Sequence, residues 1–212
     1  MKYLLVENQT YVLMGPIDWR PRMLQSEIDE LSIPWTVPPV EQGYIKITDN
    51  YEIFPVVETI MPNYDSLLEE LVGPIYTFNN NQATLTYTKK FIDITIAKNN
   101  IKNKIAASRY IKENAGTTIT INGNTYNLET DRDNRAKWYQ LANLPGPTNW
   151  KFGYNYVTLT NTDANNILEA VKTYIQTQFD WEMNIYNEID TLNSISDLQT
   201  FTVTNANVIR NV

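Results

Sequence analysis

The chain contains neither cysteine nor histidine. Their absence excludes disulfide bonds, thiol nucleophiles and imidazole metal ligands, and it removes the commonest general base at neutral pH. Carboxylate pairs, a Ser/Lys pair or an oxygen-ligated Mg²⁺ site need neither residue, so catalysis loses only its easiest routes. The sequence also lacks a Gly-rich phosphate loop, a nucleophile elbow and a paired metal motif. We therefore expect no catalytic, cofactor-binding or metal-binding residues, and we interpret the chain as a protein that is not an enzyme.

Charge and long apolar runs are also scarce. Charged residues make up 19% of the chain, and the formal net charge is -7. The basic residues are scattered instead of forming the stripe that neutralises a phosphate backbone, which argues against nucleic acid as a partner. No apolar run approaches the roughly 18 residues that span a bilayer, and the apolar start is too short for a signal peptide. We expect a protein made and used without secretory export, with no membrane partner.

Uncharged polar and aromatic residues are abundant instead, notably Asn, Thr and Tyr, and 42% of the 212 residues are hydrophobic. A chain of this size and composition can bury one core or two small ones. Much of its surface must therefore be uncharged, polar and aromatic, which suits packing against protein neighbours. A genome rich in A and T would favour the same residues through its codons, and the two explanations are compatible.

Short strand patterns and turn signals dominate residues 1–88, which we predict to form a small, mainly β domain for attachment or interaction. Three hairpins are expected, at residues 2–14 (around Asn8-Gln9), 44–57 (around Asp49-Asn50) and 75–88 (around Asn79 to Gln82). Residues 23–31 and 66–72 are interpreted as short helices. Gly15-Pro16 is interpreted as a strand breaker, and the Pro-rich residues 33–39 as a loop or an edge strand.

From Lys89 the pattern changes to helices separated by small strand pairs. The expected elements are a helix over 91–114, a hairpin over 117–128 on Asn122-Gly123, a helix over 131–144 capped by Thr130 or Asp131, and strands over 150–159. A long helix capped by Thr162 or Asp163 follows. One face of this helix is expected to carry Ile167 or Leu168, Val171, Ile175, Phe179, Tyr186 and Ile189. A further helical turn can begin at residues 196–198, and residues 201–212 are predicted as an extended C-terminal arm. The fold class is α+β: a small, mainly β N-terminal unit with short helices, then a C-terminal helix, β-hairpin, helix, β, long-helix domain over residues 89–200.

Two groups of acidic residues invite a chemical interpretation. The first group is Glu129, Asp131 and Asp133, and the second, on the long helix, is Glu182, Glu188 and Asp190. The first lacks the glycine and the distal glutamate of an EF-hand loop, so helix capping is favoured over a cation site. Arg132 and Arg135 are expected to pair with these acids or with the hairpin. The second group could hold a glycosidase-like carboxylate pair, but a solvated helix face is the favoured interpretation.

Aromatic rings near chain breaks are the candidates for contact with a partner, because amphipathic rings anchor protein interfaces. Core packing is favoured for Trp138, Trp150 and Trp181. Trp19 and Trp35 lie beside prolines or loops, where packing and partner contact are equally good interpretations. The predicted partner interface comprises Trp19, Arg20, Trp35, Tyr44, Tyr64 and Tyr76.

Several pieces of the second half, taken in order, resemble one protein family. The pieces are Ala106 to Tyr110 with Lys112-Glu113, Ile119 to Gly123, Thr130 to Arg135, Trp150-Lys151, Val157 to Thr160, and Val171 to Glu188. They resemble a domain of unknown function that recurs in tailed-bacteriophage proteins, often encoded near tail fibres, and the likeness covers residues 89 to about 200.

The first half is more loosely similar to the leading part of marine cyanophage and pelagic myophage proteins that carry this same domain. The similar residues are Leu13 to Pro16, Trp19-Arg20, Pro38-Pro39, Ile53 to Val57 and Gly73 to Phe78. This second resemblance would make the whole chain one phage protein.

The resemblance supplies no catalytic residues and implies a role in a phage tail. The first hypothesis is a virion structural protein, made in the host cytoplasm, that forms homo- or hetero-oligomers with other tail proteins at the baseplate or at a tail-fibre attachment. The second is a tail-fibre assembly chaperone, which would be absent from purified particles. A third, disfavoured hypothesis is a glycan-binding or carbohydrate-cleaving tail accessory protein that uses Trp19 or Trp35 with carboxylates.

Overall fold

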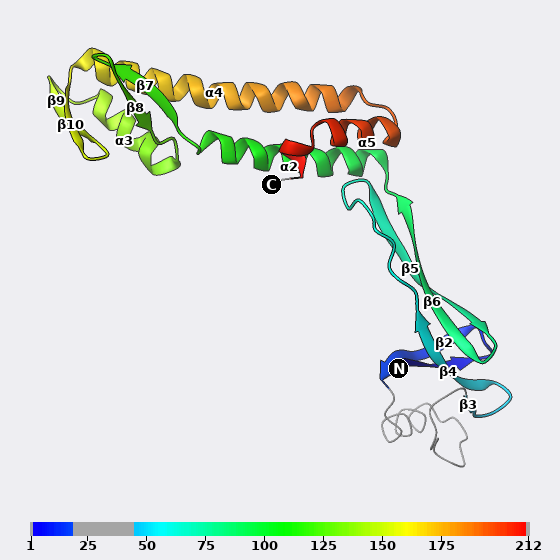
Figure 1. Ribbon diagram of the computed structural model, residues 1–212. Coiled ribbons are helices and arrows are strands. Elements are labelled where there is room, and N and C mark those ends of the chain that lie inside the picture. The colour runs from blue at the N-terminus through cyan, green and yellow to red at the C-terminus, as the bar shows by residue number, and fades with distance from the viewer. Residues whose placement is uncertain (1, 19–44, 211–212) are drawn as a thin grey trace. The chain divides into compact units, whose positions relative to one another are not determined.

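A computed structural model of the protein describes residues 2–18 and 45–210 (Figure 1). The chain divides into two compact units, unit 1 over Met1–Phe91 and unit 2 over Ile92–Val212. Unit 1 is built from strands, and unit 2 from helices with two small hairpins, so the α+β fold class is confirmed. The boundary predicted after residue 88 falls within the last strand of unit 1.

The described residues of unit 1 form a single mixed sheet. Its strands are β1 (Lys2–Glu7), β2 (Tyr11–Asp18), β3 (Ile45–Lys46), β4 (Tyr51–Glu58), β5 (Glu69–Asn79) and β6 (Gln82–Phe91). They are ordered β2-β1-β4-β6-β5, with β3 also paired to β4, and only the β4–β6 pair is parallel. The turns after β1 and β5 place Asn8 and Asn80 at positive φ, a conformation that asparagine tolerates better than most residues. All three predicted hairpins are confirmed.

The core of unit 1 lies against one face of this sheet. Its buried members are Leu4, Val6, Phe54, Val56, Ala83 and Leu85. The ring of the partly buried Phe78 packs against this core, 4.9 Å from the ring of Phe54. Tyr3 and Leu5, which alternate with the core residues of β1, are buried as well, so both faces of this strand are covered.

The short helix predicted over residues 66–72 is wrong. The chain makes a single turn after Asp65, and strand β5 begins at Glu69. Pairing with β6 overrides the local helix signal, because the ladder from Glu69 onwards satisfies the backbone groups that a helix would have paired. The predicted helix over 23–31 and the loop or edge strand over 33–39 lie outside the described residues.

The strand breaker predicted at Gly15-Pro16 is also wrong, since β2 continues to Asp18. Strand β2 lies at the edge of the sheet, where the missing proline N–H costs no ladder hydrogen bond. The pairing with β1 shifts register here, from Leu5 opposite Met14 to Tyr3 opposite Ile17. The irregular pairing with β1 at this point therefore accommodates Pro16, and strand β2 continues past it.

Unit 2 has the predicted order of elements. They are α2 (Ile94–Glu113), β7 (Thr117–Ile121), β8 (Asn124–Leu128), α3 (Arg132–Ala142), β9 (Thr148–Phe152), β10 (Asn155–Leu159), α4 (Asn161–Thr191), α5 (Ile195–Thr204) and α6 (Ala206–Ile209). Asp131 caps α3, as predicted. The cap of α4 is Thr160 and not Thr162 or Asp163, because Thr160 and Asp163 form a reciprocal capping box one turn earlier.

The extended arm predicted over residues 201–212 is wrong for the part of it that the structure describes. Helix α5 runs on to Thr204, and α6 follows immediately. Both pack on α2, because Phe201 and Ile209 are buried and the Ser108 hydroxyl donates a hydrogen bond to the Val208 carbonyl at 2.6 Å. Ile195, Leu198 and Phe201 have helical spacing, but the sequence interpretation ended the helical turn before Phe201.

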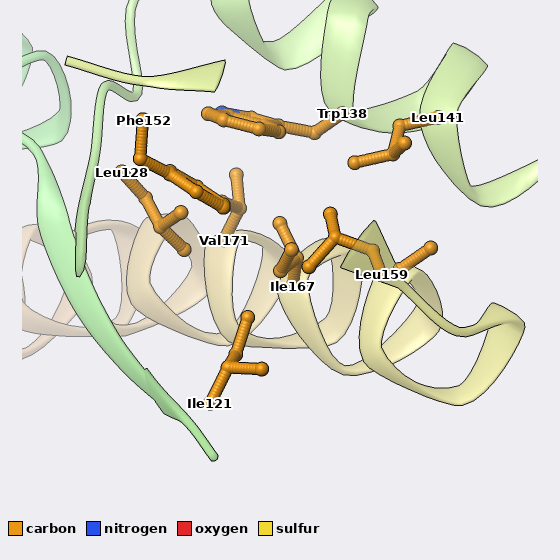
Figure 2. Packing of buried hydrophobic residues seen from close by; sticks show 9 residues of the cluster. Ile121, Leu128, Trp138, Leu141, Phe152, Leu159, Ile167 and Val171 are labelled. Carbon is orange, nitrogen blue, oxygen red and sulfur yellow. The ribbon is translucent and has the colours of Figure 1, made fainter. Parts of the chain in front are cut away.

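The main core of unit 2 fills the space between the two hairpins, α3 and the first third of α4 (Figure 2). Its members are Ile121, Leu128, Trp138, Leu141, Phe152, Leu159, Ala164, Ile167 and Val171. Trp138 is 5% exposed, which confirms its predicted core position, and its indole N–H donates to the Glu129 carbonyl at 2.7 Å. Trp150 is half-buried against this core, whereas Trp181 lies further along α4 beneath the Lys112 ammonium group.

Candidate functional site

The six residues predicted to form the partner interface divide into two groups. Trp19, Arg20, Trp35 and Tyr44 lie outside the described residues. Tyr64 is 41% exposed in the irregular segment between β4 and β5. Tyr76 lies half-buried on β5 against the core of unit 1, and this burial raises the pKa of its hydroxyl. Tyr64 is thus open to a partner, whereas Tyr76 contributes to the fold.

The acidic residues around the start of α3 cap the helix. The Asp131 carboxylate accepts hydrogen bonds from the Asp133 and Asn134 backbone N–H groups at 3.0 and 3.1 Å. The Asn134 side-chain amide adds a further bond, and together these bonds hold the pKa of Asp131 below its usual range. Within residues 2–18 and 45–210, no cluster of three or more acidic side chains is arranged to hold a metal ion.

A buried group of charged side chains joins α2, α3 and α4. Arg109 forms an ion pair with Glu113 one turn along α2, and its Nε lies 3.0 Å from the Glu182 carboxylate of α4. Arg135 of α3 reaches the other oxygen of Glu113 at 3.2 Å. We call these four residues the charge cluster. Their side chains are 17%, 7%, 14% and 31% exposed in the order Arg109, Glu113, Glu182, Arg135.

The charge cluster corrects two sequence interpretations. Glu182 was expected on a solvated helix face, but it is largely buried against Arg109. Arg135 was expected to pair with the acids around Asp131 or with the hairpin, but it binds Glu113 and donates to the Thr130 carbonyl. Glu113 lies at the end of α2, where the helix dipole disfavours a carboxylate, so the two guanidinium groups offset an otherwise unfavourable charge.

Further polar contacts continue along the α2–α4 pair. The Tyr174 hydroxyl donates to the Lys112 carbonyl at 2.6 Å, and Lys102 forms an ion pair with Asp190 at 2.7 Å. The Tyr186 hydroxyl lies 3.0 Å from both the Lys102 carbonyl oxygen and the Glu182 carboxylate. Burial, followed by the bond to Glu182, raises the pKa of Tyr186 to about 12. These directional contacts recur along both helices, so α2 and α4 are held in one register.

The long helix α4 also carries an exposed apolar surface. We define the α4 patch as Ile175, Gln176, Phe179, Asp180 and Met183. These residues line two adjoining shallow surface pockets along the helix. Phe179 is 43% and Met183 54% exposed. Phe179 was predicted to share the buried face of the helix, but its ring instead covers the Arg109 guanidinium at 4.4 Å and leaves its other side open.

The α4 patch lies on a well-supported helix. Figure 1 shows α4 running beside α2, with α5 folded back close to α2, and α5 and α6 both pack on α2. The patch could not be separated from the core stripe in the sequence, because Ile175 and Phe179 continue the same helical spacing as Ile167 and Val171. Within the described part of the chain, no helix is long and apolar enough to cross a membrane.

Comparison with known proteins places most of unit 2 in one family. The family described as "Domain of unknown function (DUF4376)" matches residues 96–205. The matched region includes all four residues of the charge cluster and the whole α4 patch. No match to the chain was found among curated proteins or among solved structures.

Proposed function

We propose that this chain, which belongs to the DUF4376 family, is a virion structural protein of a tailed phage, acting at the tail, baseplate or tail-fibre attachment. It would be made in the host cytoplasm and would bind other tail proteins, as a homo- or hetero-oligomer, without catalysis or a cofactor. The resemblance of its sequence pieces to tailed-phage proteins supports the tail location. The exposed α4 patch is the single observation that supports a role in protein–protein contact.

The composition of the α4 patch is typical of a protein interface. Aromatic and methionine side chains are enriched at interfaces, where they supply large contact areas. Phe179 and Met183 lie one turn apart on the same side of α4, and both are about half exposed. A partner that covered them would bury apolar surface at little cost in side-chain ordering for Phe179, because the ring already rests on Arg109.

The supporting helices make the patch a rigid surface. Helix α4 has 31 residues and therefore spans about 46 Å. The charge cluster fixes its register against α2, so the patch is presented in one conformation before a partner arrives. Such preorganisation lowers the entropic cost of association, which suits a structural subunit that must join its neighbours in a defined geometry.

Quantitative mass spectrometry of gradient-purified virions of the phage that encodes this chain tests the proposal. We expect the protein in a fixed ratio to the tail-tube subunit. Absence from mature particles, together with presence in the infected-cell lysate, would contradict a structural role and support a tail-fibre assembly chaperone. Absence of any association with tail proteins in either sample would contradict both.

A pair of double variants tests whether the α4 patch makes the contact. Phe179→Ser/Met183→Ser is expected to reduce incorporation into particles by at least about tenfold, because interface hot spots each contribute roughly 2 kcal/mol or more. Ile96→Ser/Ile111→Ser is the matched control, since these α2 side chains are 54% and 57% exposed. Equal incorporation of the two double variants, at equal melting temperature, would locate the contact elsewhere.

A further inference from the structure

A pocket of about 550 Å³ opens between the two hairpins and α3 of unit 2. Its volume lies within the ~300–1,000 Å³ typical of small-ligand sites. Four aromatic side chains line it: Tyr126 of β8, Trp138 of α3, and Trp150 and Phe152 of β9. The Tyr126 and Phe152 rings stack 4.6 Å apart, and those of Trp138 and Trp150 lie 5.3 Å apart. Packing therefore fixes the aromatic surface of the pocket in advance.

The four rings differ in how exposed they are to a ligand and in whether their polar groups are already hydrogen-bonded. Trp138 and Phe152 are buried, and they belong to the core shown in Figure 2. Tyr126 and Trp150 are only partly buried and present ring surface to the pocket. The Trp138 indole N–H is already bonded to a carbonyl. By contrast, no hydrogen bond to another described residue occupies the Trp150 indole N–H or the Tyr126 hydroxyl.

The polar part of the pocket is lined by Thr125, Asn127, Glu129, Asn134, Lys137, Lys151 and Asn155. Asn127 of β8 and Asn155 of β10 line it and are exposed, and neither side chain is hydrogen-bonded within the described ranges. Asn134, on the same rim, is in contrast fully engaged: its amide N–H groups bind acidic side chains, and its oxygen accepts from Lys137 at 2.9 Å. The pocket thus has two neutral amides with free donors and acceptors, next to the charged side chains of Glu129, Lys137 and Lys151 and the half-open aromatic rings.

From this combination we infer that the pocket binds a saccharide. A sugar ring has an apolar face of C–H groups, which packs on aromatic rings, and a rim of hydroxyl groups that both donate and accept hydrogen bonds. An amide offers two donors and an acceptor oxygen, so Asn127 and Asn155 match such a rim without requiring a charged ligand. A rigid apolar surface with a few fixed polar groups is the usual composition of a specific small-ligand site.

This inference goes beyond the proposed tail role and uses other residues than the glycan-binding hypothesis based on Trp19 or Trp35. The pocket is formed by the hairpins and α3, whereas the α4 patch lies further along α4. Binding of a sugar can therefore be measured on the isolated full chain, and its outcome does not depend on whether the protein enters the particle.

Saturation-transfer difference NMR on the full chain tests the inference with maltotetraose, cellotetraose, chitotetraose, trigalacturonic acid and a short oligodeoxyadenylate as probes. We expect saturation transfer to at least one saccharide, together with a change in tryptophan fluorescence. The variant Asn127→Ala/Asn155→Ala should weaken that binding roughly tenfold or more, because it removes two sets of hydrogen bonds. Asn99→Ala/Asn103→Ala, at exposed amides of α2, is the matched control and should bind as the wild type does.

The outcomes separate the inference from its alternatives. No transfer to any saccharide would overturn it, and so would saccharide binding that the pocket variant leaves unchanged at the wild-type melting temperature. Transfer to the oligodeoxyadenylate alone would replace the sugar by a nucleobase as the stacked ligand. Trp150→Phe, which keeps a ring but removes the indole N–H, should weaken binding less than the double asparagine variant.

Discussion

Helix α4 begins in an apolar core and continues along α2 through polar contacts. Ala164, Ile167 and Val171 in its first third are buried among the hairpins and α3. Between Val171 and Ile189 no α4 side chain is fully buried. In that stretch ion pairs, tyrosine hydroxyl bonds and cations over aromatic rings join the helices.

The apolar and the polar region of α4 contribute differently to the stability and the register of the helix. Apolar burial supplies most of the free energy of folding, but it is non-directional and tolerates small shifts of one helix along another. Carboxylate–guanidinium pairs and hydroxyl–carbonyl bonds are directional, so they specify a single register while adding less net stability. The polar region also needs only one side of α4, which leaves the α4 patch open. The comparison suggests that the first region holds unit 2 together and the second presents a surface.

The largest expected effect comes from the apolar region. Ile167→Ala should lower the free energy of unfolding by about 2–5 kcal/mol, because Ile167 is fully buried and its loss leaves a cavity. Ile175→Ala, about two helical turns further on and only half-buried, is the matched control and should cost clearly less. Urea denaturation followed by circular dichroism measures both. Equal losses would show that the apolar core extends further along α4 than the burial pattern indicates.

Removing the shared acid of the charge cluster should have the next largest effect. Glu113→Gln keeps the shape of the side chain but leaves Arg109 and Arg135 without their common carboxylate. Breaking a buried pair costs about 3–5 kcal/mol, and we expect about 2–3 kcal/mol because Arg135 is partly solvated. The same denaturation experiment measures the loss.

A double-mutant cycle distinguishes an interaction within the cluster from a general disturbance. In the variant Arg109→Met/Glu113→Gln, the total loss should be smaller than the sum of the two single losses, because the second change relieves the charge that the first leaves unpaired. Additive losses would show that the two side chains act independently. The coupling should persist in high salt, since partly buried pairs are screened much less than exposed ones.

The predictions that succeeded depend on signals within a few residues. The hairpin at Asn122-Gly123 was predictable because the pair accepts positive φ, and both residues adopt it. The cap of α3 was predictable because Asp131 precedes the helix directly. The failures at residues 66–72 and 201–212 arise where pairing with β6 or packing on α2 decides the structure. Those partners lie too far away in the sequence for a local pattern to reveal them.

The charge cluster could be predicted only in part from the sequence. Arg109 and Glu113 lie one helical turn apart, whereas Arg135 and Glu182 lie in two other stretches of the sequence. The structure brings the four side chains into one group. The i,i+4 spacing of Arg109 and Glu113 on the predicted helix indicates their pairing, but the sequence gave no indication that Arg135 and Glu182 would join them. The aromatic pocket was missed for the same reason, because its rings come from two hairpins and a helix.

The smallest expected effect is at the start of α4, at the outer end of its apolar region. The Asp163 carboxylate accepts hydrogen bonds from the Thr160 hydroxyl at 2.6 Å and from its backbone N–H at 2.9 Å, and these bonds lower the pKa of Asp163. A lowered folded-state pKa contributes stability that is present above the unfolded value of about 3.9 and is lost as the pH falls through the folded pKa. Asp163→Asn should therefore cost about 1 kcal/mol at neutral pH, the usual loss for a helix cap, and progressively less below about pH 4.

Thermal melts of wild type and variant from pH 7 down to pH 2.5 measure this difference, with Glu188→Gln on the exposed side of α4 as control. A difference in melting temperature that stays constant over this range would mean that the capping box stabilises α4 through its geometry and not through the carboxylate charge.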